Sequence, residues 1–113
     1  MAITISTWKH GIDATKTSIK ILNNNGTALD SVEKGVKVTE ADPKVRTVGY
    51  GGYTDDTGKV TVDASIMDHE GNAGSVAYLE NIKHPISVAR KVMESSRHVM
   101  LVGSGAYNFA IDN

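Results

Sequence analysis

The chain has 113 residues and a mass of 12.1 kDa, the size of one small domain, and residues 1–113 are expected to form a single structural unit. Hydrophobic residues make up 40% and charged residues 22%, which excludes an intrinsically disordered chain and a collagen-like repeat, and no window is apolar enough for a membrane span. A formal charge of −1 gives no electrostatic reason to expect nucleic acid or a membrane surface as partner, and the absence of cysteine excludes disulfides and thiol nucleophiles.

The first part of the chain predicts a short strand and two helices. Residues 3–7 alternate apolar and polar side chains and predict a strand. Apolar residues recur at helical spacing over 12–22, and the Asn- and Gly-rich residues 23–26 are expected to end that helix. A second helical pattern covers 29–39, with Thr27 as its N-cap and Asp42 and Pro43 after its end.

The middle of the chain predicts an antiparallel hairpin. Residues 60–67 carry apolar side chains at every second position, as expected for a strand with one buried face. A polar turn at 69–72 leads into a second apolar strand over 75–79. Residues 48–50 are a candidate third strand of the same sheet.

The last third returns to helix and strand. Pro85 suits the first position of a helix whose apolar stripe runs to Met93, and residues 99–102 predict a buried strand. A helical stretch follows from Gly103 to Asn113 with no capping residue or polar tail after it. The fold class is therefore α+β, without repeats or linkers, and the abrupt end leads us to expect one piece of a larger folded unit.

Several residues are candidates for function, each with a structural alternative. Trp8 is the only tryptophan; such a residue is most often a core anchor, but at the end of a strand it is well placed to form the wall of a ligand pocket. The glycines of residues 48–53 allow close approach of a ligand, or simply a bulge or tight turn. The four histidines (His10, His69, His84 and His98) show no metal-ligand spacing and are expected to be exposed or to cap helices, so no metal site is predicted.

Four segments of the sequence resemble the α chain of the glycosylasparaginase (aspartylglucosaminidase) family. They read STWKHG, NNNGTALDSVEKGV, DPKVRTVGYGGYTDDTGKVTVDASIMD and GSVAYLENIKHPISVARKVMESSRHVMLVGSGAYNFA. The resemblance runs from about Thr4 to the end, and both the order and the separation of the segments agree. The related plant-type asparaginases and isoaspartyl peptidases typically carry His-Gly-Gly after the first strand, where this chain has Thr7 and Trp8, which favours the glycosylasparaginase branch.

The resemblance implies a fold and a mechanism. Members are N-terminal nucleophile (Ntn) hydrolases with a four-layer αββα sandwich, of which this chain would be the α-subunit part. Their precursor cleaves itself, and the freed threonine at the start of the β chain is the nucleophile, its α-amino group acting as base. The family's cleavage signature, His-Asp-Thr, is absent here, so no catalytic residue is expected in this chain. The family needs no cofactor.

The resemblance also assigns roles to a few residues of this chain. Trp8 matches the tryptophan that forms a wall of the substrate pocket, and this replaces the expectation of a core anchor. His10 stands at a position where relatives typically carry phenylalanine, on the sugar side of that pocket. Thr47 matches a hydroxyl residue close to the nucleophile, and Gly49, Gly51 and Gly52 are expected to shape the strand beside it.

The function expected from the resemblance is hydrolysis of N4-(β-N-acetylglucosaminyl)-L-asparagine or related β-aspartyl amides. Its partners would be the β chain from the same precursor, in an (αβ)₂ assembly, and the small-molecule substrate. The alternatives are an isoaspartyl peptidase or L-asparaginase, and an inactive fragment or small binding module. The amino terminus lacks a basic region followed by an apolar stretch, so no targeting segment is expected in this chain, and the compartment stays open.

Overall fold

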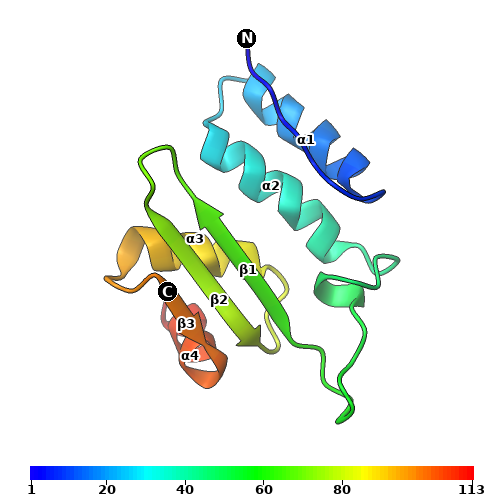
Figure 1. Cartoon of the computed structure of the whole chain (residues 1–113), viewed down its shortest axis with the longest axis vertical. Helices are drawn as coiled ribbons and strands as arrows, with labels where there is room; N and C mark the ends of the chain where they lie inside the picture. Colours follow the sequence, from blue (N-terminus) through cyan, green and yellow to red (C-terminus); the bar gives the residue numbers. More distant parts are fainter.

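The computed structural model describes all residues, 1–113, and forms a flat slab of 45 × 35 × 19 Å (Figure 1). Its elements follow the chain as α1 (Gly11–Asn23), α2 (Ala28–Ala41), a 3₁₀ turn η1 (Gly49–Gly51), β1 (Val62–Met67), β2 (Ala73–Leu79), α3 (Pro85–Ser95), β3 (Met100–Val102) and α4 (Gly103–Asp112). The expected helices and the hairpin are thereby confirmed. None of the helices combines the length and the apolar sequence that a bilayer crossing requires.

Helices α1 and α2 form an antiparallel pair that packs through small side chains. Thr27 caps α2, since its hydroxyl oxygen accepts a hydrogen bond from the backbone N–H of Asp30 at 3.0 Å. Ser18 and Ser31 are both buried, and each hydroxyl donates to the other residue's carbonyl oxygen, at 2.9 and 3.1 Å. A Cβ atom at Gly35 would collide with the Ser18 hydroxyl, so the close approach of the two helices depends on that glycine.

The sheet has the order β1-β2-β3, with β1 and β2 antiparallel and β3 parallel to β2. The hairpin turn is closed by Asp68, whose carboxylate accepts hydrogen bonds from the backbone N–H groups of Glu70 and Asn72, each at 2.9 Å. The register is interrupted by a bulge between Val62 and Ala64. Helix α3 provides the crossover from β2 to the parallel strand β3, as a parallel connection requires.

The core lies between one face of the sheet and the helices α3 and α4, which Figure 1 shows behind the strands. It contains eight buried residues: Ile66, Val76, Leu79, Ile86, Val88, Ala89, Val92 and Ala106. Gly74 allows α3 to approach β2, because a Cβ atom there would strike backbone atoms of Ala89 and Met93. The other face of the sheet, turned toward the viewer in Figure 1, is uncovered, and Ser65 and Met67 of β1 are exposed.

Two of the strands predicted from the sequence, at residues 3–7 and 48–50, are absent from the structure. Residues 3–7 make no backbone hydrogen bond, and Ile3 and Ile5 are 85% and 92% exposed. An alternating sequence forms a strand only when a neighbouring strand is available, and this chain offers none at that place. Residues 48–50 do not join the sheet either, because Gly49 has a φ of +66° and turns the backbone into the 3₁₀ segment.

Charged groups join the α1–α2 pair to the sheet and its helices along the contact between α2 and α3. Arg90 of α3 donates to Asp30 at 2.7 Å and to Glu33 at 2.8 Å, and Ser87 donates to Glu33 at 2.6 Å. The hydrogen bond from Arg90 lowers the pKa of Asp30. Burial opposes ionisation of Glu33, but the hydrogen bonds from Ser87 and Arg90 outweigh it and lower its pKa below the ordinary value. Asp30 and Glu33 therefore take part in the contact between α2 and α3.

The Arg90 contacts predict a dependence of stability on pH. Because the pKa values of Asp30 and Glu33 are lowered in the folded state, their contribution to stability is fully present above the ordinary values of 3.8 and 4.5. It is lost as the pH falls below these values and through the lowered folded-state pKa values. We expect Arg90→Met to lower the free energy of unfolding by about 1–2 kcal/mol at pH 7. Urea unfolding from pH 7 to 3 should show this difference shrinking; a constant difference would contradict the assignment.

Gly49 is held tightly against the end of α2. A Cβ atom at this position would lie 2.5 Å from both the Cα atom and the carbonyl oxygen of Glu40, and its φ of +66° is unfavourable for any other residue. Gly58 also has a positive φ, of +86°, but nothing lies within 4 Å of its Cβ position. The two glycines therefore separate the cost of backbone strain from the cost of a close contact.

We expect Gly49→Ala to lower the free energy of unfolding by about 2–4 kcal/mol, because strain and overpacking add. Gly58→Ala, the matched control, should cost only about 1 kcal/mol, from backbone strain alone. Denaturant unfolding of the two variants measures the difference. Equal losses would mean that the contact between Gly49 and Glu40 is not tight.

Candidate functional site

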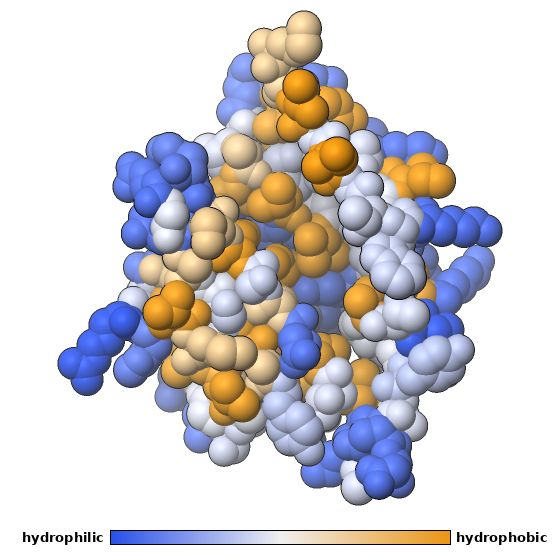
Figure 2. Space-filling model, viewed as in Figure 1, coloured by the Kyte–Doolittle hydropathy of each residue, from blue (hydrophilic) through white to orange (hydrophobic).

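A cavity of about 440 Å³ lies between the amino-terminal segment, α2 and the uncovered face of β1. Its wall combines residues from five parts of the chain, among them Thr7, His10, Val36, Glu40, Val48, Gly49, Asp63 and Ser65. Two of the expected site residues, His10 and Gly49, therefore line one cavity although they lie far apart in the sequence. Figure 2 shows the same side of the molecule, where hydrophobic side chains are exposed around the hollow.

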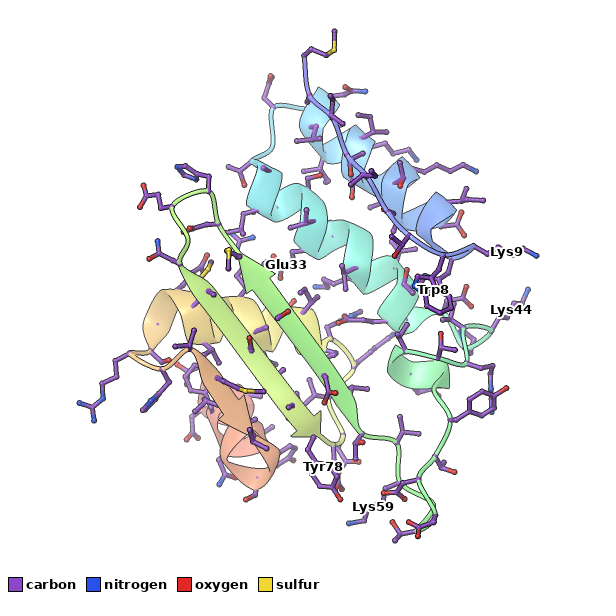
Figure 3. The ribbon with its side chains drawn as sticks, viewed as in Figure 1. Trp8, Lys9, Glu33, Lys44, Lys59 and Tyr78 are labelled. Atoms are coloured by element: carbon purple, nitrogen blue, oxygen red, sulfur yellow. The ribbon has the colours of Figure 1, made fainter.

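Trp8 lies at the turn into α1 and is not a core residue. Its side chain is 77% exposed, so the alternative of a core anchor is wrong. Its φ of +65° places the backbone in the left-handed region, which is strained for a large side chain. The indole ring is parallel to the imidazole of His10 within 3°, with 6.4 Å between centroids. In Figure 3, Trp8 lies at the end of the molecule where α2 ends and the turn with Lys44 begins.

The remaining expected residues, Thr47, Gly51 and Gly52, lie on the turn that carries η1. Two backbone hydrogen bonds of 3.0 Å close this turn, from the Gly52 N–H to the Gly49 oxygen and from the Tyr53 N–H to the Arg46 oxygen. Gly51 is buried, and a Cβ atom there would lie 2.5 Å from the Pro43 oxygen. These glycines thus shape a tight turn and not a strand. Thr47 is exposed and does not line the cavity.

Glu40 and His84 form a pair that the sequence did not reveal. Glu40 is 4% exposed, and its carboxylate lies 3.0 Å from Nδ1 of His84 and accepts a 2.9 Å hydrogen bond from the backbone N–H of Ile86. Burial raises the pKa of Glu40, opposed by the hydrogen bonds from Ile86 and His84. His84 stands at the N-cap position of α3, as expected of a capping residue, but its side chain makes no capping hydrogen bond. The expectation of an exposed side chain is wrong, because the imidazole is only 28% exposed and pairs with Glu40. The two residues are 44 positions apart, so no local pattern indicates the contact.

Asp63 is the second carboxylate on the wall of the cavity. Its Oδ1 atom accepts a 2.8 Å hydrogen bond from the backbone N–H of Tyr78, across the bulge between β1 and β2. Tyr78 has a φ of +51°, so this hydrogen bond holds an unusual backbone conformation. No three His, Cys, Asp or Glu side chains converge in a way that would hold a metal ion.

A second cavity, of about 530 Å³, lies on the other side of Gly49. It is lined by Tyr50, Lys59, Glu80 and Lys83 among others, and Lys59 lies 3.5 Å from Glu80 within it. Lys59 and Glu80 are both partly exposed, and such surface pairs contribute little. The smaller cavity is the better candidate site, because it brings together separate segments that carry the sequence-predicted residues.

Comparison with known proteins identifies the family. A sequence profile described as asparaginase matches residues 6–113. The chain is 57% identical over 109 residues to the N(4)-(beta-N-acetylglucosaminyl)-L-asparaginase of Elizabethkingia miricola, covering 96% of this chain and 32% of that protein. It is 41% identical over 112 residues to the enzyme of the same name from Rattus norvegicus, covering 98% of this chain and 32% of the relative.

A third relative has a different printed activity. The chain is 50% identical over 86 residues to a plant-type L-asparaginase of Pyrococcus horikoshii, covering 75% of this chain and 28% of that protein. The chain thus spans about a third of the length of the relatives it matches. The resemblance to the glycosylasparaginases is confirmed, and the chain belongs to the asparaginase family.

Proposed function

We propose that this chain is the α-subunit part of an amidohydrolase that cleaves the side-chain amide of N4-(β-N-acetylglucosaminyl)-L-asparagine or a related β-aspartyl amide. The observation that carries the proposal is the 57% identity, over 96% of the chain, to a relative named for that substrate. The nucleophile is a threonine at the start of a β chain made from the same precursor. Its hydroxyl attacks the amide carbon, and its α-amino group takes the proton and passes it to the leaving amine. Water then releases aspartate from the threonine.

The solvent-exposed area of the chain is evidence for a large partner. A compact protein of this mass exposes about 6,000 Å², whereas this chain exposes 7410 Å². The excess of about 1,400 Å² is more than the ~800 Å² per partner of a standard stable interface. It includes the uncovered sheet face, with Met67, Met100 and Val102 all more than half exposed (Figure 2).

The occupant of that face is, in this proposal, a second sheet contributed by the β chain. Two sheets face to face with helices outside make the αββα sandwich, and the 19 Å thickness of this chain fits one helix layer and one sheet. Residues 3–7 would then pair with a neighbouring strand of the β chain, which explains why an alternating sequence lies unpaired here. The (αβ)₂ assembly is part of the same proposal.

This chain contributes substrate contacts rather than reacting groups. Trp8 does not itself line the 440 Å³ cavity, but its exposed ring stacks beside His10, which does, and we propose that it extends the wall of the substrate pocket. Thr47 lies on the glycine-rich turn next to the same cavity and is proposed to stand close to the nucleophile. No cofactor is needed for this chemistry.

A second activity, that of an L-asparaginase or isoaspartyl peptidase, is supported by 50% identity to the archaeal asparaginase. It is also supported by 44% identity over 94 residues to the isoaspartyl peptidase/L-asparaginase of Mus musculus. The two activities share the nucleophile and differ in the leaving group. Comparison of the products from glycosylasparagine, asparagine and a β-aspartyl dipeptide therefore distinguishes them.

The test of the main proposal uses the full-length protein that contains this chain. We expect purification to yield a second polypeptide that begins with threonine on amino-terminal sequencing and that stays bound to this chain. We also expect N-acetylglucosamine and aspartate to be released from glycosylasparagine faster than ammonia from asparagine. A lone chain without amidase activity would instead favour an inactive fragment or binding module.

Replacement of Trp8 by alanine should raise KM by about tenfold with little change in kcat, because a pocket wall binds ground state and transition state alike. Trp8→Phe, which keeps an aromatic wall, should recover most of the loss. Steady-state kinetics on glycosylasparagine measures both constants, and a denaturing gel shows whether the precursor still cleaves. Parallel loss of self-cleavage and hydrolysis would show that Trp8 is needed for the architecture.

A further inference from the structure

The carboxylate of Glu40 connects three separate parts of the molecule. It belongs to the last turn of α2, and its side chain accepts the backbone N–H of Ile86 at the start of α3. It also pairs with His84, which precedes α3. Its main chain is the surface against which Gly49 is packed, since Glu40 Cα and O are the atoms nearest the Cβ position of Gly49.

This arrangement leaves the turn at 46–53 little freedom to move relative to α3 and the sheet. Gly49 lies against Glu40, and Gly51 lies against the Pro43 and Val45 oxygens of the segment that follows α2. The glycines thus fix the turn to the end of α2, and Glu40 fixes the end of α2 to α3. The position of Thr47 relative to α3 therefore depends on the main chain of Glu40, which the buried Glu40 carboxylate ties to His84 and Ile86.

Joining two helices through a buried carboxylate costs free energy, because the charged form loses its contact with water. Ionisation of Glu40 is opposed by burial, and its folded-state pKa lies above the ordinary value, so ionisation near neutral pH costs stability. The groups that face it are His84 and, more weakly, Lys37 of its own helix, while His10 and Asp63 line the same cavity. If the only role of Glu40 were to hold α2 against α3, apolar side chains of similar volume could stabilise that contact equally well.

We propose that Glu40 is a positioning residue that holds the turn carrying Thr47 in place beside the substrate cavity. This inference deepens the proposed function and rests on it for its catalytic consequence. The structural part is independent, because it concerns the order of residues 46–53 whether or not the protein hydrolyses an amide. A displacement of about 1 Å in a positioned group is enough to cost about 100-fold in rate.

The experiment uses the full-length protein with Glu40→Ala and Glu40→Gln. The glutamine keeps an acceptor for the Ile86 N–H and can donate to His84, whereas alanine removes both contacts. Glu70→Ala is the matched control, because Glu70 also neighbours a histidine, His69 at 3.7 Å, but on the exposed hairpin turn. Amide hydrogen exchange over 46–53 and steady-state kinetics are measured on each variant.

In Glu40→Ala we expect loss of exchange protection at the Gly52 and Tyr53 amides and a fall in kcat of tenfold or more, with KM within about threefold of wild type. In Glu40→Gln we expect both protection and kcat to stay within about threefold of wild type, and Glu70→Ala to change neither. Unchanged protection and kcat in a folded Glu40→Ala protein would overturn the inference.

Two further outcomes are also decisive. If Glu40→Ala fails to fold, His84→Ala removes one of the two contacts and should still loosen the 46–53 amides; unchanged protection and kcat in that variant would overturn the inference. If the wild-type protein has no amidase activity but Glu40→Ala loosens the turn, the proposed function fails while the positioning role stands. The exchange measurement therefore separates failure of the inference from failure of the proposed function.

Discussion

The contact between α2 and α3 is the constraint on which the arrangement of the molecule depends. The helical pair α1–α2 lies beside the sheet in Figure 1, and it is joined to α3 by charged and hydrogen-bonded groups and to the hydrophobic core by Leu29. Arg90 with Asp30 and Glu33 holds one end of this contact, and Glu40 with His84 holds the other. These bonds are directional, so they act at defined points along the contact between α2 and α3.

The same contact determines where the candidate cavity lies. The cavity occupies the space on the sheet side of α2, with β1 opposite and the amino-terminal segment along one edge. The helices of the core are on the far face of the sheet, so nothing within this chain fills that space. In the proposed assembly, the β chain would close this open cavity, and the present chain spans about a third of the length of its relatives.

The elements that could be predicted from the sequence are those held together by local periodicity. The apolar stripes of α1, α2 and α3, the alternation of β1 and the turn closed by Asp68 lie within short windows, and each was found. Residues 3–7 had the right pattern but no partner strand, and residues 48–50 were misread because the φ of Gly49 depends on its contact with Glu40. A local pattern cannot indicate either condition.

The candidate site could be predicted only in part for a similar reason. His10 and Gly49 line one cavity, and Trp8 stacks on His10 without lining it, so the structure brings three of the expected residues into one region. The pair of Glu40 and His84 was missed, since neither residue stands in a motif and 44 positions separate them. Long-range polar pairs of this kind follow from the fold and not from the sequence pattern.

The open sheet face has a consequence for how such a protein is made. A surface with Met100 and Val102 beside an edge strand, together with an unpaired segment carrying Ile3 and Ile5, invites association with the wrong chains during synthesis. In the proposed precursor, both chains are translated as one polypeptide, so the correct complement would be present at an effective concentration of about millimolar from the outset. Covalent linkage until folding is finished would then protect the nascent sheet, and the buried interface would hold the two chains together after the proposed cleavage.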